Sequence, residues 1–288
     1  MLIDLQIHST YSDGYLTPTD VVRFLAERKV RVAALTDHNT VGGLDEFRWA
    51  CKQHKIKPIN GLELYVKYKN KKMNILWYNF NENSSELHGL LRETHMRRRA
   101  SVRRILLKLQ KRGFKMDVEK ILDRYNRYIP INRLTDELIS IPENFKKVKK
   151  ELNLKFPREE DVIHNYFRNK NIGLLQESYI QIERVFALRK KIGGQIILCH
   201  PAKYSYINRN DWAQFKKMGM DGVEIFSPHH NYGAIMYIQH LAREFNFIET
   251  GGSDFHRFEG NNFPVQNSWQ YFEIRSRLMR GVNKIIGN

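Results

Sequence analysis

The sequence predicts an α/β fold, a parallel β/α barrel that carries a helical insertion. Short apolar runs alternate with amphipathic helical segments along most of the chain, as expected for strands joined by helices. Polar side chains able to bind metal or phosphate follow nearly every apolar run, and the active site of a β/α barrel lies at its strand ends. The stretch 81–180 is the exception, since it has helical spacing and no strand pattern, and we interpret it as an insertion.

The first apolar run, residues 3–7, alternates apolar and polar side chains as a short strand does. It leads directly to His8 and then to Asp13, which lies in a Ser-Asp-Gly segment. The following residues, 17–29, predict a capped helix with proline in its first turn. We therefore expect His8 and Asp13 on the loop that leaves the carboxyl end of the first strand.

Six further apolar runs predict the remaining strands: RVAALTDHNT, IKPINGLELYV, MNILWYNF, QIILCHP, DGVEIFSPHH and FIETGGSDFH. A helix that ends near Lys52 separates the first two of them. In MNILWYNF, the fourth predicted strand, the polar residue is Asn74, and it lies early in the run rather than at its end. The seven strands supply a common set of candidate ligands: His8, His38, Glu63, Asn74, His200, His230, Asp254 and His256.

The insertion is rich in basic residues. Its apolar positions between Leu87 and Leu109 recur at helical spacing, and the segment 92–115 holds ten Lys or Arg against one acidic residue, Glu93. The whole chain has a formal net charge of +17, which favours polyanionic partners such as nucleic acid or phosphorylated nucleotides. A solvated helix face without a ligand explains the same basic pattern equally well.

Composition excludes several classes of protein. With 288 residues, 42% of them hydrophobic, the chain can bury a full core. It has no apolar run near the roughly 18–20 residues of a membrane span and no signal-peptide pattern, so we expect a cytoplasmic protein without membrane contact. The two cysteines, Cys51 and Cys199, are far apart and support neither a disulfide framework nor a thiolate zinc site.

Histidines and carboxylates on loops from several strands make chemical sense if they converge on divalent metal ions. Imidazole and carboxylate suit Zn, Mn or Fe, and a shared carboxylate such as Glu63 can bridge two ions. A centre of this kind suits hydrolysis of phosphate esters by metal-activated water, without a nucleophilic side chain.

Five segments, in this order, resemble the motifs of the polymerase and histidinol phosphatase (PHP) family of metal-dependent phosphoesterases: DLQIHSTYSDG, LTDHNT, INGLELYV, ILCHPAKYS and GGSDFH. The chain is most similar to the subgroup acting on nucleoside 3′,5′-bisphosphates and RNA 5′ ends. The resemblance implies a distorted (β/α)7 barrel formed by residues 1–80 and 181–288. It also implies that the insertion, 81–180, caps the active-site face, and that the barrel holds up to three metal ions.

The resemblance also implies three ligand sets. One ion would be held by position 6 with His8, Glu63 and Asp254; a second by Glu63, position 74 and His200; and a third by Asp13, His38 and His256. Asp37, beside His38, would orient a ligand rather than bind metal.

Two positions depart from the family pattern. Gln6 and Asn74 stand where the family has histidines, and their neutral amides are weaker ligands than imidazole for zinc-like ions. Three explanations are compatible with this change. The protein is an active enzyme that uses fewer or harder ions such as Mn or Mg, or a degenerate relative that binds nucleic acid without cutting it, or a chain with two deliberate inactivating substitutions.

The resemblance also places three positions near the substrate phosphate. One is an arginine of the insertion helix, with Arg97, Arg98 and Arg99 as the candidates, and the others are Arg133 and His230. A capping or exposed histidine is the alternative interpretation of His230. The leading hypothesis is thus a phosphatase or 5′ exonuclease for nucleotides or short RNA or DNA that uses Mn, Zn or Fe. The alternatives are a non-catalytic nucleic-acid-binding relative and a small-metabolite phosphatase. The sequence does not indicate the oligomeric state.

Overall fold

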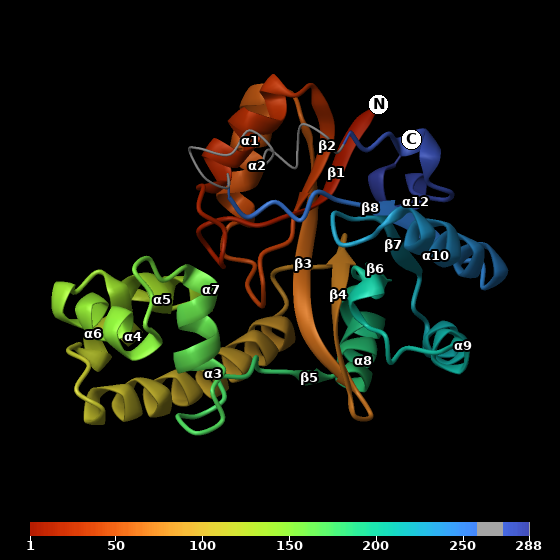
Figure 1. Cartoon of the computed structure of the whole chain (residues 1–288). Helices are drawn as coiled ribbons and strands as arrows, with labels where there is room; N and C mark the ends of the chain where they lie inside the picture. The colour runs from red at the N-terminus through yellow and green to blue at the C-terminus, as the bar shows by residue number, and fades with distance from the viewer. Residues whose placement is uncertain (258–272, 288) are drawn as a thin grey trace. The chain divides into compact units, whose positions relative to one another are not determined.

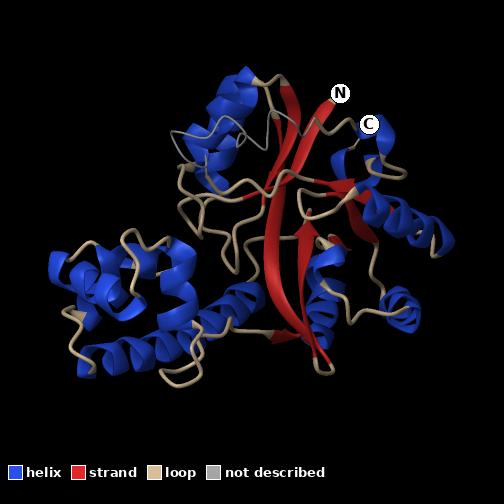
Figure 2. Cartoon of the chain, in the orientation of Figure 1, coloured by secondary structure: helices blue, strands red, loops and turns tan. Residues whose placement is uncertain are grey.

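A computed structural model describes residues 1–257 and 273–287. It divides into two compact units, one formed by Met1–Gly89 with Tyr179–Asn288 and the other by Leu90–Ser178. The first unit holds the sheet and the second is helical (Figures 1 and 2). In the described part of the chain, no helix combines the length and the apolar character that crossing a bilayer requires.

The first unit contains one eight-stranded sheet. Its strands are β1 (Leu2–Ile7), β2 (Val30–Leu35), β3 (Lys57–Tyr68), β4 (Lys71–Tyr78), β5 (Ile180–Gln181), β6 (Gln195–Leu198), β7 (Gly222–Phe226) and β8 (Ile248–Gly251). They follow the order β1-β2-β3-β4-β6-β7-β8, and β5 pairs with β3. The seven predicted strands are all present. The additional strand β5 was not predicted, since two residues give no periodicity to read.

Helices connect most of these strands. They are α1 (Pro18–Glu27), α2 (Leu44–His54), α8 (Ile182–Ile192), α9 (Arg209–Met218), α10 (Tyr232–Glu244) and α12 (Asn283–Ile286), with short 3-10 turns at Pro201–Lys203 and Ser276–Leu278. The predicted cap of the first helix is present, because Thr17 accepts a hydrogen bond from the backbone N–H of Asp20.

Strand β4 corrects the prediction of a parallel barrel. It runs antiparallel to both of its neighbours, β3 and β6, whereas β1, β2 and β3 pair in parallel, as do β6, β7 and β8. The reason is the two-residue connection between β3 and β4, which is long enough only for a hairpin. As a result, the start of β4 lies at the same edge of the sheet as the ends of the parallel strands.

The residues after β8 join the sheet to β1. The backbone N–H of Asp254 donates to the carbonyl of Gln6 at 3.0 Å, and the N–H of His8 donates to the carbonyl of Phe255 at 2.9 Å. These bonds bring the two ends of the strand order together, as closure of a barrel requires. Ile3, Leu5 and other buried apolar side chains fill the interior beneath this junction.

The second unit is built from helices alone. It contains most of α3 (Ser85–Lys111), then α4 (Val118–Arg124), α5 (Ile131–Ile139), α6 (Pro142–Leu152), α7 (Glu159–Val162) and a π-helical turn at Ile163–Phe167. Its apolar core includes Val102, Leu106 and Leu109 of α3, at the helical spacing seen in the sequence. The predicted boundaries of 81 and 180 and the predicted capping role remain predictions.

Replacing Gly252 by alanine tests the junction that closes the sheet. A Cβ at Gly252 would lie 2.3 Å from Cβ and 2.4 Å from N of Gln6, so we expect Gly252→Ala to lower the free energy of unfolding by about 2–3 kcal/mol. Thermal or denaturant unfolding measures the change. The matched control is Gly89→Ala in α3, where nothing lies within 4 Å of the added methyl group and alanine favours the helix. Equal stability of the two variants would contradict the proposed closure.

Candidate metal centre

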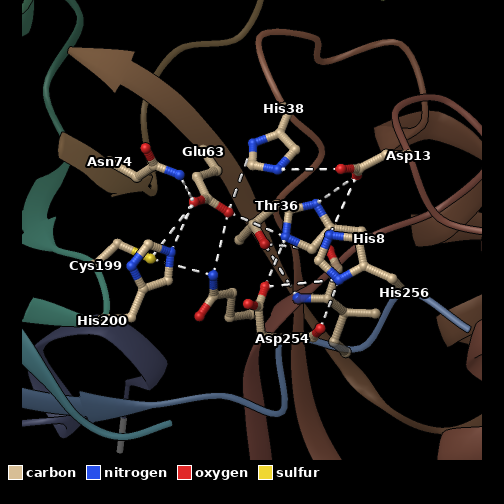
Figure 3. Close-up of polar contacts among 12 residues, drawn as sticks. His8, Asp13, Thr36, His38, Glu63, Asn74, Cys199, His200, Asp254 and His256 are labelled. Atoms are coloured by element: carbon tan, nitrogen blue, oxygen red, sulfur yellow. Dashed lines mark hydrogen bonds and ion pairs between the residues drawn. The ribbon is translucent and has the colours of Figure 1, made fainter. Parts of the chain in front are cut away.

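The candidate ligands come together at one edge of the sheet (Figure 3). His8 directly follows β1, Glu63 lies within β3, and His200 follows β6. His38 comes after β2, Asp254 and His256 come after β8, and Asn74 lies near the start of β4. Because β4 runs antiparallel, this early position meets the strand ends, which explains why its polar residue precedes most of the apolar run.

The first group of ligands surrounds His8. Its Nε2 atom lies 3.0 Å from Oε2 of Glu63 and 3.2 Å from Oδ1 of Asp254. Although His8 is completely buried, neither of its ring nitrogens has a hydrogen-bond partner of good geometry among the described residues. Buried polar groups normally have such partners, so this arrangement favours a bound cation between the three side chains.

The second group surrounds Asp13. Its Oδ1 atom lies 3.3 Å from Nε2 of His256 and 3.7 Å from Nδ1 of His8, and its Oδ2 atom lies 3.5 Å from Nε2 of His38. Four ligand atoms from these residues lie within 4.8 Å of one another. This set contains one carboxylate and three imidazoles, which suits a zinc-like ion.

The third group surrounds the other oxygen of Glu63. Oε1 lies 3.4 Å from Nε2 of His200 and 3.6 Å from Sγ of Cys199, and it accepts a hydrogen bond from Nδ2 of Asn74 at 2.6 Å. Glu63 therefore contributes one oxygen to the His8 group and the other to the His200 group. This is the position of a bridging carboxylate.

The two amides that replace family histidines both contact Glu63. Nε2 of Gln6 donates to Oε2 at 3.1 Å, and Nδ2 of Asn74 donates to Oε1. Each oxygen of the central carboxylate thus receives one amide hydrogen bond. The two departures from the family pattern are linked through a single side chain.

The carboxylates of the centre are held in their ionised forms. Burial alone raises the pKa of Glu63, but the facing histidines, His38 first, outweigh it and hold the pKa well below its ordinary value. Asp13 and Asp254 show the same balance between burial and nearby histidines, and the pKa of each is also lowered. Ionised carboxylates are the form that binds divalent cations.

The pKa of His8 moves in the opposite direction. Burial lowers it, but Asp254 and Glu63 together raise it well above the ordinary value because they favour a positive charge on the ring. The field that favours a proton at His8 also favours a cation in the same place. The buried imidazole nitrogens, the ionised carboxylates and their spacing therefore fit divalent metal ions.

Residues behind the ligands fix their backbone. The carboxylate of Asp37 accepts hydrogen bonds from N and Oγ of Ser9, at 2.7 and 2.6 Å, and from Oγ of Ser12 at 2.5 Å. It thus binds the loop that carries His8, in agreement with an orienting role. On the other side, Oε2 of the buried Glu224 accepts a hydrogen bond from the backbone N–H of His200 at 2.8 Å.

Two adjacent histidines after β7 differ in their surroundings. Nδ1 of His230 contacts the carbonyl of Ile225 at 2.8 Å, and its Nε2 accepts from the N–H of Ala202 at 3.4 Å, so both ring nitrogens bind backbone. This arrangement does not fit the predicted contact between His230 and a substrate phosphate. His229 instead lies 2.7 Å from Oδ2 of Asp254, with 35% of its side chain exposed.

The predicted arginines lie in the helical unit. Arg98 is buried and donates to the carbonyls of Ile129 and Gln176, which makes it part of that unit's own structure. Arg97 has 42% of its side chain exposed, and Arg99 has 19%. Arg133 lies 3.8 Å from Asp136. Their predicted contacts with substrate remain predictions.

Sequence reasoning missed three residues of the centre: Cys199, Glu224 and His229. Glu224 gave a usable signal, since a carboxylate inside the apolar run DGVEIF has to be buried and bonded. Cys199 gave none, because a cysteine in an apolar strand is ordinarily a core residue. The two histidines of the SPHH segment cannot be told apart by spacing.

Comparison with known proteins agrees with the class that the barrel and its histidine–carboxylate cluster define. Residues 4–129 match the PHP domain. This match agrees with the predicted family.

Two curated relatives extend over most of the chain. A 5′-3′ exoribonuclease of Haemophilus influenzae is 26% identical over 88% of this chain and 89% of its own length. A phosphoribosyl 1,2-cyclic phosphate 1,2-diphosphodiesterase of Eggerthella lenta is 28% identical over 89% of this chain and 94% of its own. A solved structure from Bifidobacterium adolescentis, described as a metal-dependent phosphoesterase, has a TM-score of 0.74 at 17% identity. It covers 96% of this chain and 97% of its own, and this likeness confirms the PHP-like barrel fold.

Elemental analysis of protein purified without chelator tests the centre. We expect at least one transition metal ion per chain, and we expect Glu63→Ala to lose most of it because Glu63 contacts all three ligand groups. The matched control is His240→Ala, which removes an exposed histidine of α10 and should leave the metal content unchanged. Metal-free wild-type protein that fails to take up added zinc or manganese would contradict the assignment.

Proposed function

We propose that the chain is a metal-dependent phosphoesterase that hydrolyses phosphate esters of nucleotides or short nucleic acids. The observation that carries this proposal is the convergence of His8, Asp254 and both oxygens of Glu63 in one buried cluster. The two relatives support it, since both are named as enzymes that cleave phosphate esters of ribose compounds.

The ions of this centre would be Mn, Zn or Fe, up to three in number. Their ligands would come from the three groups described above, with Gln6 and Asn74 as weak or lost ligands. Bound divalent ions lower the pKa of coordinated water and offset the charge of the phosphoryl oxygens. Because metal-activated water would be the nucleophile, no described side chain of the centre has to attack the phosphate.

Glu63 has the role of holding the two sides of the centre at a fixed separation. Oε2 faces His8 while Oε1 faces His200, so the position of one carboxylate sets the spacing of both groups. The hydrogen bonds from Gln6 and Asn74 restrict its rotation. A fixed spacing matters because a phosphate must contact several positive groups at once.

His229 is the residue that we propose for contact with the substrate. Its Nε2 is engaged with Oδ2 of Asp254, and this contact orients the ring. Nδ1 is then the atom that can donate to a phosphate oxygen or to the leaving oxygen. Partial exposure keeps the ring within reach of an incoming substrate.

The charge distribution supports a polyanionic substrate. Within Leu90–Ser178 the sequence has 22 Lys or Arg and 12 Asp or Glu, a net +10 of the chain's +17. Clustered positive charge attracts nucleic acid because each neutralised phosphate releases counterions. This favours an oligonucleotide over a small neutral ester.

A non-catalytic nucleic-acid-binding protein is the second candidate, and one observation favours it. The amides of Gln6 and Asn74 donate to Glu63, so they compete with a metal ion for the electron pairs of the bridging carboxylate. A centre weakened in this way could keep its ligand without cleaving it.

Hydrolysis assays separate these candidates. With Mn or Zn added, we expect release of phosphate or nucleotide from a 5′-phosphorylated oligonucleotide, and slower release from a generic aryl phosphate because it lacks the polyanionic chain. His240→Ala should retain full activity. Salt-sensitive oligonucleotide binding by metal-loaded protein, without cleavage of either substrate, would establish the binding protein instead.

Paired substitutions distinguish the adjacent histidines. His229→Ala should lower kcat/KM about 10–100-fold with little change in stability, because the residue is half-exposed and contacts Asp254. His230→Ala should mainly lower the melting temperature, since it leaves two backbone groups without partners. Steady-state kinetics and thermal unfolding provide the two measurements. The reverse pattern would return the substrate role to His230.

A further inference from the structure

Cys199 belongs to the buried core of the barrel, and its sulfur also borders the candidate metal centre. The residue is completely buried between the end of β6 and His200. Its Sγ atom lies 3.6 Å from Oε1 of Glu63, and Nε2 of His200 lies 3.4 Å from the same oxygen. Sulfur, imidazole nitrogen and carboxylate oxygen thus surround one small volume (Figure 3).

These separations fit ligands of one tetrahedral ion. With zinc–sulfur bonds of about 2.3 Å and zinc–oxygen and zinc–nitrogen bonds of about 2.1 Å, ligand atoms lie about 3.6 Å apart for sulfur and oxygen, and about 3.4 Å for nitrogen and oxygen. The observed distances agree with both values.

The backbone is shaped so that two consecutive residues face Glu63. In a regular strand, successive side chains point to opposite faces of the sheet. His200 breaks this alternation with a φ of +29°, an unusual value for a residue other than glycine. The hydrogen bond from its N–H to Glu224 stabilises this conformation. Strained backbone of this kind is commonly found at functional sites.

The ring of His200 is oriented for binding. Its Nδ1 contacts the hydroxyl oxygen of Tyr204 at 3.1 Å, and that oxygen also accepts from the N–H of Asn74 at 2.8 Å. A hydroxyl oxygen has two lone pairs, so it can accept from Nδ1 as well. The lone pair of Nε2 then points toward Glu63 and Cys199, as in metal-bound histidines whose other nitrogen is hydrogen-bonded.

A second buried polar group points to a ligand at the same place. Nε2 of Gln6 lies 3.1 Å from Sγ of Cys199, whereas its Oε1 atom has no hydrogen-bond partner among the described residues although the side chain is fully buried. When a cation binds, a half-turn of the amide would exchange its oxygen and nitrogen, at the expense of the hydrogen bond from Nε2 to Oε2 of Glu63. The oxygen would then face the volume between sulfur and carboxylate, where a cation would satisfy it.

We propose that Cys199, as a thiolate, binds a thiophilic divalent ion such as zinc together with Glu63 and His200. The thiol proton leaves to solvent when the ion binds, since a coordinating thiol is deprotonated. The fourth position is available to the amide oxygen of Gln6 or to water. This inference depends on the metal centre of the proposed function, and it selects zinc over the harder ions Mn and Mg for this position.

The thiolate of Cys199 would compensate for the two strong imidazole ligands that are absent at positions 6 and 74. Amide oxygens at positions 6 and 74 are neutral and weak, whereas a thiolate adds a negative charge and a soft donor. Sequence spacing had indicated no thiolate zinc site, because that expectation applies to sites built from several cysteines. One cysteine suffices when a histidine and a carboxylate complete the set.

Cobalt substitution tests the proposal without an activity assay. Metal-free protein loaded with Co²⁺ should show a thiolate-to-cobalt charge-transfer band in the near ultraviolet. Cys51→Ala is the matched control, since it removes a buried cysteine outside the centre and leaves Cys199 as the only thiol in the chain. The band should persist in Cys51→Ala and be absent from Cys199→Ser, which should also bind one zinc equivalent fewer.

The outcomes separate this inference from the proposed function. If Cys51→Ala binds cobalt without the band, Cys199 is not a ligand, whether or not the protein hydrolyses phosphate esters. If the band is present but no phosphate ester is cleaved, the ligand assignment holds and the phosphoesterase proposal fails. The Cys51→Ala spectrum decides the question even if the Cys199 variants do not fold.

Discussion

The arrangement of ligands at the edge of the barrel depends on one requirement, the compensation of the charge of Glu63, whose carboxylate is completely buried. An ionised carboxylate in a protein interior is strongly disfavoured unless other groups compensate its charge and satisfy its oxygens. Three strands contribute to that compensation: β1 through Gln6 and His8, β4 through Asn74, and β6 through His200. The strand ends have to meet because each supplies a partner to the same two oxygens.

The strand ends can meet at Glu63 because one strand, β4, runs antiparallel to its neighbours. Strand β3 extends past the edge where its parallel neighbours end and returns through the hairpin as β4. Glu63 and Asn74 therefore lie on neighbouring strands that run in opposite directions, and β6 adds Cys199 beside them. The residues after β8 then close the ring by bringing Asp254 to His8. Local hairpin geometry thus determines which ligands become neighbours.

The sequence was most informative where residue type and position pointed to the same conclusion. A histidine such as His8 that ends an apolar run is easily recognised, because an apolar strand places it at a sheet edge. The direction of β4 was not predicted, since the two-residue turn was hidden in a lysine-rich stretch. Arg98 could not be separated from Arg97 and Arg99, because three consecutive helical residues span about 200° of the helix surface.

The residues hardest to predict are those that sit within apolar runs, and they change the chemistry most. Glu224 binds the backbone N–H of His200, whose positive φ brings its ring to Glu63 beside Cys199, while Cys199 itself faces the barrel interior like Ile197. A pattern of residue types cannot show such a conformation, since it arises from a contact between two strands. The exchange of two imidazoles for two amides and a sulfur therefore has to be judged as one rearrangement around Glu63. Each amide hydrogen bond withdraws negative charge from the carboxylate, and a thiolate would restore that charge at the neighbouring position. The ligand changes at positions 6, 74 and 199 then compensate one another. They give the centre a different preference among metal ions and do not amount to separate losses of ligands.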